Sequence, residues 1–301
     1  MGRYRIAFFS GTGCTALVAD SLEKALGQRG CETRVEKIAA GASSGSFGEG
    51  GSVSASADTL ILLFPVYACT APGPVMEWIK TLRQAGNAPA AVLSVSGGGE
   101  VSPNTASRVG ALKALKQKGY EVFFEDSIAM PSNIAVATPE RVSIQLINHL
   151  PEKAGAIADS VTEGAEKRMR PLIFDRFFAW AGRAIRPYSK RWGKRILVSN
   201  DCDGCGLCAR QCSTGNIEMQ NMPWDNSEAK IPVFGGRCCM CLGCFYSCPK
   251  KALRPKTGKS LIVEGFALIE LLEKAKDPAG VETGPFPKSK VWRGIKKYLS
   301  E

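Results

Sequence analysis

Residues 5–15 read Arg-Ile-Ala-Phe-Phe-Ser-Gly-Thr-Gly-Cys-Thr. They contain the signals of a strand, a glycine loop and the start of a helix. The first half of this stretch is apolar and β-rich, and the second half leads into a helical pattern. Glycines let backbone N–H groups approach a phosphate at the positive end of a helix, and the hydroxyls of Ser10, Thr12 and Thr15 add hydrogen-bond donors. The stretch therefore predicts a strand, loop and helix that bind a phosphate monoester.

The same loop also matches the dinucleotide fingerprint G-x-G-x-x-A from Gly11 to Ala16, which is a weak signal by itself. A dinucleotide site requires an acidic residue at the end of the second strand, where Lys37 and Ile38 stand instead. Three hydroxyls also suit a terminal phosphate better than a pyrophosphate. We therefore expect a mononucleotide rather than NAD.

Short β-rich segments alternate with helical patterns from the glycine loop to about residue 165, which is typical of parallel βαβ units. The expected strands are 5–10, 32–38, 59–64, 90–95 and 121–126. The expected helices are 15–27, 72–84, 103–118 and 139 into the 160s. The glycine-rich and serine-rich stretch 41–56 predicts a loop. This pattern predicts a doubly wound sheet of five parallel strands.

The cysteines carry the second strong signal, because nine of the twelve lie between residues 202 and 248. Two runs repeat the spacing C-x₂-C-x₂-C-x₃-C, in which three thiols bind one [4Fe-4S] cube and the fourth binds the neighbouring cube. The first predicted ligand set is Cys202, Cys205, Cys208 and Cys248, and the second is Cys238, Cys241, Cys244 and Cys212.

Structural zinc is the alternative, but it normally uses two separated C-x-x-C pairs and leaves the third cysteine of each run unexplained. A disulfide framework is disfavoured because we expect a reducing, cytoplasmic location: no secretory signal and no long apolar span are recognisable. Cys239 is expected to be a packed or hydrogen-bonding thiol beside a ligand. The insert from residue 216 to 236, which contains Trp224, is expected to form a hairpin that shields one cluster.

The cysteine runs and the glycine loop each resemble a sequence pattern of a known protein family. The cysteine module resembles bacterial two-cluster ferredoxins over about sixty residues, with Ser213 where that family usually has proline. The glycine loop resembles the S/T-x-T-G-x-T loop of flavodoxins. This resemblance implies FMN, with its ring held by the loops after the third and fourth strands. The residues so expected to bind FMN are Ser10, Gly11, Thr12, Gly13, Cys14, Thr15, Pro65, Val66, Tyr67, Ala68, Ser96, Gly97, Gly98 and Gly99. The loop from Met130 to Asn133 also resembles the flavin-bordering loop of flavodoxin-like quinone reductases.

The expected organisation is an α/β flavodoxin-like domain (1–165), a basic aromatic linker helix (166–197), a small α+β bacterial ferredoxin-like domain (198–260) and a C-terminal helix and tail (261–301). Residues 167–195 contain ten Lys or Arg and one acidic residue. The aromatic residues of this linker are expected to pack between the domains while its charges stay solvated. Contact with an anionic membrane surface is the less favoured alternative.

Over nearly its whole length the chain resembles fused proteins in which a flavodoxin-like domain precedes a two-cluster ferredoxin. That resemblance implies a carrier that converts between two-electron and one-electron partners and docks a redox protein. The alternative is a flavin-dependent reductase of a small molecule. No catalytic residue is assigned, and His149 is expected to be structural. The formal charge of +11 suggests an acidic partner, but no nucleic-acid module is recognisable.

Overall fold

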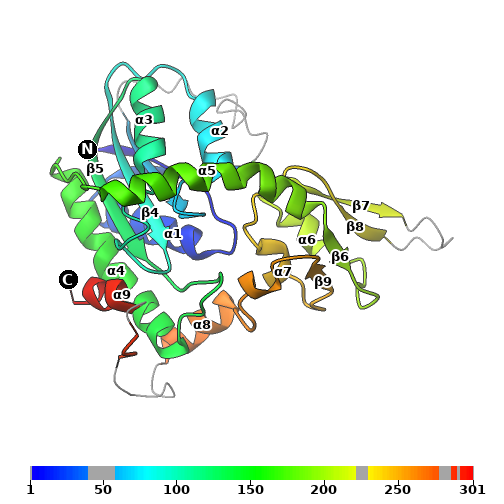
Figure 1. Cartoon of the computed structure of the whole chain (residues 1–301). Coiled ribbons are helices and arrows are strands. Elements are labelled where there is room, and N and C mark those ends of the chain that lie inside the picture. The colour runs from blue at the N-terminus through cyan, green and yellow to red at the C-terminus, as the bar shows by residue number, and fades with distance from the viewer. Residues whose placement is uncertain (1, 40–57, 222–229, 278–285, 290–291, 301) are drawn as a thin grey trace.

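The computed structural model describes residues 2–39, 58–221, 230–277, 286–289 and 292–300. The loop expected at 41–56 and Trp224 lie outside these ranges. Five strands form one parallel sheet in the order β2-β1-β3-β4-β5 (Figure 1). Their bounds are β1 Arg3–Phe8, β2 Glu32–Lys37, β3 Thr59–Pro65, β4 Ala88–Ser96 and β5 Tyr120–Ala129. The predicted doubly wound five-stranded sheet is confirmed, and its strand order is that of the flavodoxin-like fold.

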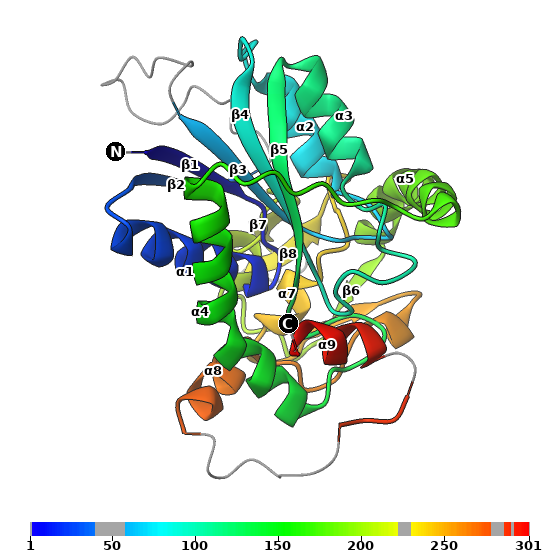
Figure 2. The same ribbon diagram turned by 90° about the vertical axis from the view of Figure 1, so that its left-hand side faces the viewer.

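Helices cover both faces of this sheet (Figure 2). On one face lie α1 (Cys14–Gln28) and α4 (Glu140–Thr162), and on the other lie α2 (Gly73–Thr81) and α3 (Val109–Gln117). The central strand β3 is buried on both sides: Ile61 and Leu63 face α1 and α4, whereas Leu62 and its alternate neighbours face α2. A continuous apolar run is what a parallel strand between two helical layers requires. Helix α3 begins later than residue 103, because turns occupy 102–108.

The cysteine-rich part is small and mixed in structure. It contains two antiparallel pairs, β6 with β9 and β7 with β8, and two short helices that follow the cysteine loops. The bounds are β6 Ile196–Val198, α6 Leu207–Arg210, β7 Ile217–Asn221, β8 Lys230–Phe234, α7 Gly243–Tyr246 and β9 Leu253–Pro255. The predicted hairpin is present as β7 and β8. It lies over the first cysteine loop, because Met219 and Pro232 border the same small hollow as Cys202 and Cys205.

The C-terminal segment returns to the large sheet after a short helical turn, Lys259–Leu261. Helices α8 (Leu268–Lys276) and α9 (Arg293–Tyr298) pack against α4 and its core. Trp292, Ile295 and Tyr298 are buried there, and the His149 ring packs edge-on against Tyr298 at a centroid distance of 5.4 Å. The last residues therefore complete the core of the first module, which gives His149 its structural role.

Helix α5 (Ile173–Gly193) runs along the outside of the molecule from the sheet to the cysteine-rich part (Figure 1). The prediction that its aromatic side chains pack between the modules is wrong for most of them. Five are exposed and only Trp192 is buried, where its Nε1 donates to the Thr257 carbonyl at 2.7 Å. The physical reason is that small residues occupy the side of α5 that faces the protein, where large rings have no room. At Gly182, for example, a Cβ would lie 1.8 Å from the Ala68 carbonyl oxygen. The five exposed aromatic residues are Phe174, Phe177, Phe178, Trp180 and Tyr188.

A buried charge network fixes the segment before α3. Arg108 is 1% exposed and donates to Glu100 at 2.8 and 2.9 Å, to the Ser94 hydroxyl at 2.7 Å and to Glu125 at 3.5 Å. Burial raises the pKa of Glu125, and the guanidinium groups of Arg108 and Arg168 oppose that rise. Removing one member of such a network leaves its partner charged and buried, which is costly.

We expect Arg108→Leu to reduce the free energy of unfolding by about 3–5 kcal/mol at pH 8. The loss should be smaller near pH 5. A carboxyl group whose pKa is raised by folding destabilises the folded protein at pH values above that pKa, where the group is ionised. Without Arg108 the folded pKa of Glu125 rises further, so protonation at low pH removes the unpaired charge. Urea unfolding at the two pH values measures both effects. Lys276→Gln, which removes an exposed pair with Glu273, is the control and should cost at most about 1 kcal/mol. An equal loss at both pH values for Arg108→Leu would contradict the role of Glu125.

Candidate functional site

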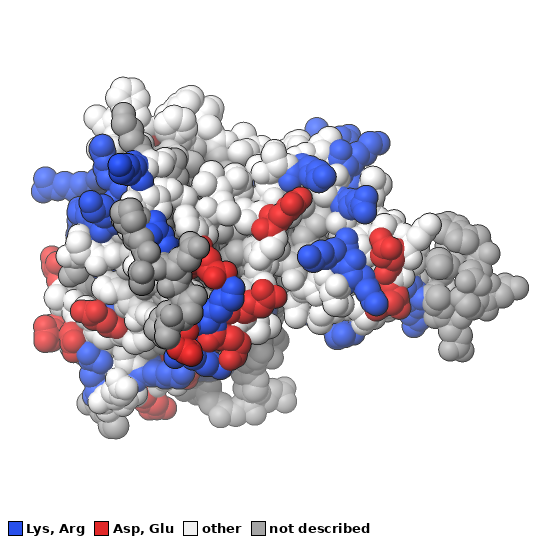
Figure 3. Space-filling model, turned by 90° about the horizontal axis from the view of Figure 1, so that it is seen from below, with Lys and Arg blue, Asp and Glu red and all other residues white. Residues whose placement is uncertain are grey.

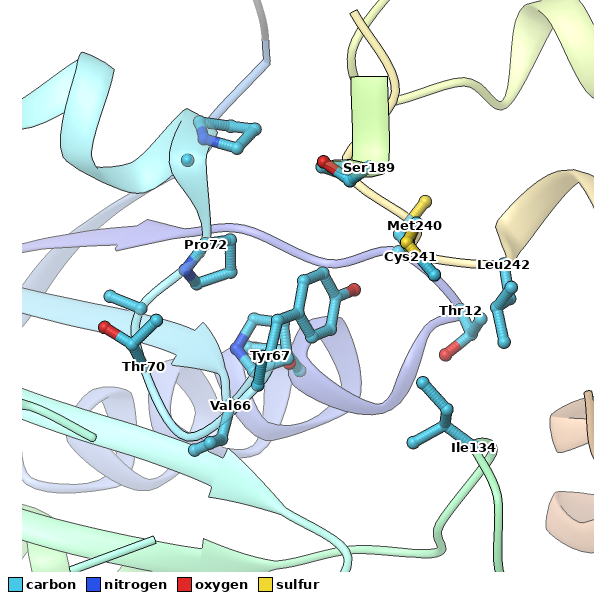
Figure 4. A pocket seen from close by; sticks show the side chains of 18 of the residues that line it. Thr12, Val66, Tyr67, Thr70, Pro72, Ile134, Ser189, Met240, Cys241 and Leu242 are labelled. Atoms are coloured by element: carbon cyan, nitrogen blue, oxygen red, sulfur yellow. The ribbon is translucent and has the colours of Figure 1, made fainter. Parts of the chain in front are cut away.

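A cavity of about 420 Å³ lies at the carboxyl ends of the parallel strands, where the loops that follow β1, β3, β4 and β5 meet helix α5 and the second cysteine loop. This edge is where open α/β sheets bind ligands, and the volume falls within the about 300–1,000 Å³ of small-molecule and cofactor sites. Figure 4 shows side chains from both modules around it. Most of the predicted FMN-binding residues line this one cavity: Ser10, Gly11, Thr12, Cys14, Thr15, Pro65, Val66, Tyr67, Ala68, Ser96 and Gly97.

The glycine loop forms one end of the cavity, at the N-terminus of α1. Gly13 precedes the helix with φ +105°, a conformation that favours glycine, and its N–H donates to the Ser10 hydroxyl at 3.2 Å. The first turn of α1 contains no acidic side chain. The Asn133 side-chain amide donates to the Thr12 hydroxyl and so ties the loop after β5 to the glycine loop. The N–H groups of a first helical turn, the hydroxyls of Ser10, Thr12 and Thr15 and the absence of an acidic side chain in this turn suit an anion.

The loops after β3 and β4 form the side walls, but not with all the residues expected. The Tyr67 and Thr70 backbones bond each other in a tight turn, with Ala68 at φ +47° and Cys69 at φ +61°. Gly98 and Gly99 do not line the cavity. They contact α9 instead. Gly294 of α9 lies so close to Gly98 that a Cβ on Gly294 would be 2.1 Å from the Gly98 carbonyl oxygen. Gly13 also lies behind the lining, where it shapes the backbone of the glycine loop.

Tyr67 is the central aromatic side chain of the cavity. Its ring packs edge-on against Phe9 at a centroid distance of 6.3 Å and points toward Met240 and Cys241 (Figure 4). Burial raises the pKa of its hydroxyl well above the usual range, and the nearby thiols Cys241 and Cys239 add to the rise. Tyr67 is therefore a neutral ring that lies between the two modules.

Two walls of the cavity come from elements that lie far away in sequence, and sequence reasoning did not find them. From α5, Arg186 donates through Nη2 to the Ala71 carbonyl at 3.0 Å, while its buried Nε has no hydrogen-bond partner in the part of the chain described. Ser189 donates to the Cys238 carbonyl at 3.1 Å. The second cysteine loop contributes residues 237–242. No local pattern signals these contacts, because a basic residue on a solvated helix looks the same whether or not it borders a cavity.

The two predicted ligand sets, with their exchange of the fourth cysteine, stay a prediction, and the charge interactions among the thiols describe only their surroundings. Burial raises the pKa of the Cys208 thiol, and Cys202, Cys248 and Cys205 add to the rise. In the second predicted set, burial raises the pKa of Cys238 to about 12, and Cys241 and Cys212 contribute. Burial also raises the pKa of Cys244, and Cys241, Cys238, Cys212 and Cys208 add to the rise. Cys208 belongs to the other predicted set, so the thiols of the two sets lie near one another.

The two cysteine runs also share a hydrogen-bonding pattern. The N–H of Asn216 donates to the Cys212 sulfur at 3.2 Å, and the N–H of Ala252 donates to the Cys248 sulfur at 3.3 Å. Each donor lies four residues after its sulfur, so the repeat in sequence is a repeat in structure. Backbone N–H bonds to sulfur stabilise thiolates. Among the described residues no three His, Cys, Asp or Glu side chains are close enough to enclose a single metal ion.

The remaining thiols behave as buried side chains. Burial raises the pKa of Cys14 to about 12, and burial likewise raises that of Cys69. Cys239 donates to Cys241, which raises the pKa of Cys239 and lowers that of Cys241. This agrees with the expected hydrogen-bonding role of Cys239. A lowered pKa makes a thiol more reactive, and none of Cys14, Cys69 and Cys239 has a lowered pKa.

The glycine loop and the second cysteine loop touch through their backbones. A Cβ on Gly11 would lie 2.5 Å from Cys241 Cβ and 2.6 Å from the Tyr67 hydroxyl. In the reverse direction, a Cβ on Gly243 would lie 2.5 Å from the Gly11 carbonyl oxygen. Real Cβ atoms do not approach other atoms so closely, so the contact requires glycine on both sides. A predicted phosphate loop and a predicted cluster ligand are therefore adjacent.

Comparison with known proteins finds solved structures that resemble about half of this chain. No family model and no curated protein matches the chain. Among solved structures it resembles a short-chain flavodoxin associated with a non-canonical PDU bacterial microcompartment, at 13% identity over 55% of this chain and 100% of that one, with a TM-score of 0.38. Flavodoxin 2 from Bacillus cereus matches at 15% identity over 54% of this chain and 99% of that one, with a TM-score of 0.37.

The rubredoxin oxygen:oxidoreductase of the anaerobe Desulfovibrio gigas matches at 13% identity over 55% of this chain and 37% of that one, with a TM-score of 0.36. These scores are too low to carry functional inference, so the assignment of the fold depends on strand order. The N-terminal module is flavodoxin-like. In the described residues no helix is both long and apolar enough to cross a membrane.

The contact between the modules predicts how glycine substitutions differ. We expect Gly243→Ala to lower the free energy of unfolding by about 1–3 kcal/mol, because the new methyl group overlaps the Gly11 backbone. Gly27→Ala is the matched control. A Cβ at Gly27 meets nothing within 4 Å, so this helical substitution should be stabilising by up to about 1 kcal/mol. Chemical denaturation measures both variants. If Gly243→Ala were as stable as the wild type, the close contact would be absent in solution.

Proposed function

We propose that this chain is an electron-transfer flavoprotein that holds FMN in the cavity and two [4Fe-4S] clusters in the cysteine-rich module, and that it carries electrons for a partner redox enzyme. The observation that carries the proposal is the contact between Gly11 of the glycine loop and the Cys241 to Gly243 segment. It brings a mononucleotide loop and a cluster-ligand loop together inside one chain. Two adjacent redox sites in one polypeptide are what a converter between two-electron and one-electron partners needs.

The residues of the cavity fit FMN. The N-terminus of α1, with the hydroxyls of Ser10, Thr12 and Thr15, suits a phosphate monoester. The remaining walls are largely apolar or aromatic, as a flat ring system requires, and Tyr67 and Met240 are among them. The buried Nε of Arg186, which has no partner among the described residues, is a hydrogen-bond donor available to a polar edge of a ligand. These features support a flavin mononucleotide over a dinucleotide.

The cysteine loops fit two four-iron cubes. Each predicted set contains four thiols, three from one loop and one from the other run. Backbone N–H groups stabilise the sulfurs of Cys212 and Cys248 in equivalent positions.

When bound, FMN supplies one-electron or two-electron transfer and each cluster supplies one-electron transfer. The residues of the chain would hold the two sites next to each other. Tyr67, Cys241 and Leu242 line the cavity where the glycine loop and the second cysteine loop meet (Figure 4). A short, packed separation favours electron transfer within the chain over loss of electrons to solvent.

A small-molecule reductase is the alternative function, and the cavity walls give it less support. Glu77 is the only carboxylate among the lining residues, and its side chain is exposed to solvent. A reductase usually positions a proton donor at the reacting atom, with a pKa matched to that task. The buried hydroxyl of Tyr67, whose pKa is raised by burial, is a poor donor near neutral pH. The carrier function is therefore the better supported of the two.

The phosphate assignment predicts selective loss of FMN in Thr15→Val. Thr15 lines the cavity and is 2% exposed, so the change removes a hydroxyl while nearly keeping the shape. A hydrogen bond to a charged group contributes about 1.5–3 kcal/mol, so FMN should bind about 10-fold to 100-fold more weakly. Riboflavin, which lacks the phosphate, should bind with unchanged affinity. Fluorescence titration of the flavin-free protein measures both constants.

The control for Thr15→Val is Thr162→Val at the far end of α4, where the hydroxyl bonds the Ala158 carbonyl at 2.9 Å. It should change neither affinity. A variant that weakens FMN and riboflavin equally would show that Thr15 shapes the cavity and does not contact the phosphate.

The ligand exchange predicts how cysteine variants combine. The wild-type protein, purified without oxygen, should contain about one FMN and about eight irons. Cys208→Ala and the double variant with Cys248→Ala should each retain about four irons, because both residues serve one cluster. Cys208→Ala combined with Cys244→Ala should retain almost none. Iron and acid-labile sulfide assays measure this, and Cys31→Ala, outside both sets, is the control. Loss of both clusters in the Cys208 and Cys248 double variant alone would contradict the assignment, and zinc without flavin would refute the function.

A further inference from the structure

The outer face of helix α5 is the largest unexplained surface feature of the molecule. Eight of the thirteen large hydrophobic residues that are exposed in the described structure lie between Leu172 and Tyr188. Ile173 and Phe174 are 83% and 82% exposed, and Phe177 and Trp180 are each 62% exposed. Single exposed apolar residues are ordinary, but a contiguous row of large ones marks a binding surface. We call these eight residues the α5 face: Leu172, Ile173, Phe174, Phe177, Phe178, Trp180, Ile185 and Tyr188.

The α5 face cannot turn inward, because contacts along the opposite side of the helix hold it. Asp175 is fully buried and accepts hydrogen bonds from the Ser102 hydroxyl at 2.7 Å and the Thr105 hydroxyl at 2.5 Å. Gly182 lies against the Ala68 carbonyl, and Ser189 bonds the second cysteine loop. In Figure 2 the helix stands at the side of the molecule, clear of the sheet. The apolar residues are therefore presented outward by a fixed scaffold.

The charges around the α5 face are almost all positive. The only acidic residue of the helix, Asp175, is the one buried against the body. Arg176, Arg183 and Lys190 are exposed and recur every seven residues, which places them in one row along the helix. No ion pair within the described ranges neutralises these three side chains. The face viewed in Figure 3 differs, since acidic and basic side chains intermix over the first module there.

We propose that the α5 face docks the protein flat on an anionic lipid bilayer. An interfacial helix combines aromatic and apolar residues on one side with Lys and Arg beside them, and it lies in the plane of the membrane. At about 1.5 Å per residue the α5 face, from Leu172 to Tyr188, extends over about 25 Å along one side of the helix. The basic row complements anionic headgroups, and Trp180 and Tyr188 suit the interfacial region.

Charge complementarity favours a lipid surface over the other candidate occupants. A second copy of this chain would bring an equally basic α5 face against the first, with no exposed acidic residue on either helix to offset the repulsion. An acidic protein would neutralise the row of cations but would also have to cover eight large apolar side chains. A bilayer provides both anionic headgroups and a deformable apolar interior, so it satisfies the charges and the aromatic rings together.

Docking in this orientation has a consequence for the cavity. Gly182 and Arg186 line the cavity from the inner side of α5, and Ile185 and Lys190 border it as well, while the exposed residues from Leu172 to Trp180 would enter the lipid interface. The thickness of one helix, about 10–12 Å with its side chains, would then separate the cavity from the headgroups. The docked protein would thus present its redox site to a partner at the membrane surface.

The test is flotation of the full-length protein, with its cofactors, on vesicles of phosphatidylcholine alone or of phosphatidylcholine mixed with phosphatidylglycerol. We expect binding to the mixed vesicles only, and weaker binding at about 1 M than at about 0.1 M salt because exposed charges are screened. Vesicles should shift tryptophan fluorescence to shorter wavelength, and Trp180→Phe should remove that shift. Absence of binding to the anionic vesicles would overturn the proposal.

Two sets of variants separate the contributions of charge and apolar surface. Arg176→Gln and Arg183→Gln together should weaken binding about 30-fold, since each cation near the surface contributes about 1 kcal/mol; Lys190 is left unchanged because it lines the cavity. Phe174→Ser with Phe177→Ser should weaken it at least about 100-fold. Ile269→Ser, which alters a 77% exposed residue on α8, is the control and should leave binding unchanged.

Each variant must keep the visible absorption and unfolding midpoint of the wild type, so that lost binding reports on the surface and not on folding. Sedimentation velocity without lipid tests the competing occupant. Self-association that disappears in the Phe174 and Phe177 variant, without anionic-vesicle binding by the wild type, would assign the face to a second copy and overturn membrane docking. Equal binding of both variant sets and the wild type would also overturn it.

Discussion

The structure depends on one close backbone contact, between the glycine loop after β1 and the second cysteine loop. Gly11 and Gly243 approach so closely that neither position has room for a side chain. The contact requires the carboxyl edge of the sheet to face the cysteine-rich module and encloses a cavity between them. The organisation of the candidate site follows from this constraint, because Tyr67, Met240 and Cys241 become neighbours only once the two loops touch.

Helix α5 keeps that contact in place and also divides the molecule into an inner and an outer side. Its inner residues are small or hydrogen-bonded: Gly182 against Ala68, Arg186 to the Ala71 carbonyl and Ser189 to the Cys238 carbonyl. Each of these contacts joins the helix to a loop that lines the cavity. The same helix exposes its aromatic residues and its row of cations to solvent. A single element can therefore link the cavity to the proposed docking surface, because its two sides make different kinds of contact.

The two modules are stabilised in different ways. The flavodoxin-like sheet has two large apolar cores, one on each face, and the C-terminal residues Trp292 to Tyr298 complete one of them. The cysteine-rich part has only a small core around Trp192, Ile196 and Leu253. A module with so small a core normally depends on metal or other cross-links for stability. The proposed clusters would supply such cross-links, and the Trp192 side chain of α5 belongs to the small core of this module.

The sequence by itself determined the elements whose signals are local. The apolar run of β3 and the glycine loop before α1 each depend on residues that are close in the chain, so the five-stranded sheet and most of the residues that line the cavity could be predicted. The repeated cysteine spacing is also local, and the two thiol sets that it predicts stay a prediction. The sequence could not assign the position of α5, because an amphipathic pattern does not say which side meets the protein. Only the tertiary structure decided that small residues of α5 face inward and its aromatic residues outward, that Gly98 packs against α9 instead of lining the cavity, and that Gly11 touches Gly243. Those contacts join segments up to 232 positions apart along the chain, and their geometry depends on the packing of whole modules and not on local propensity.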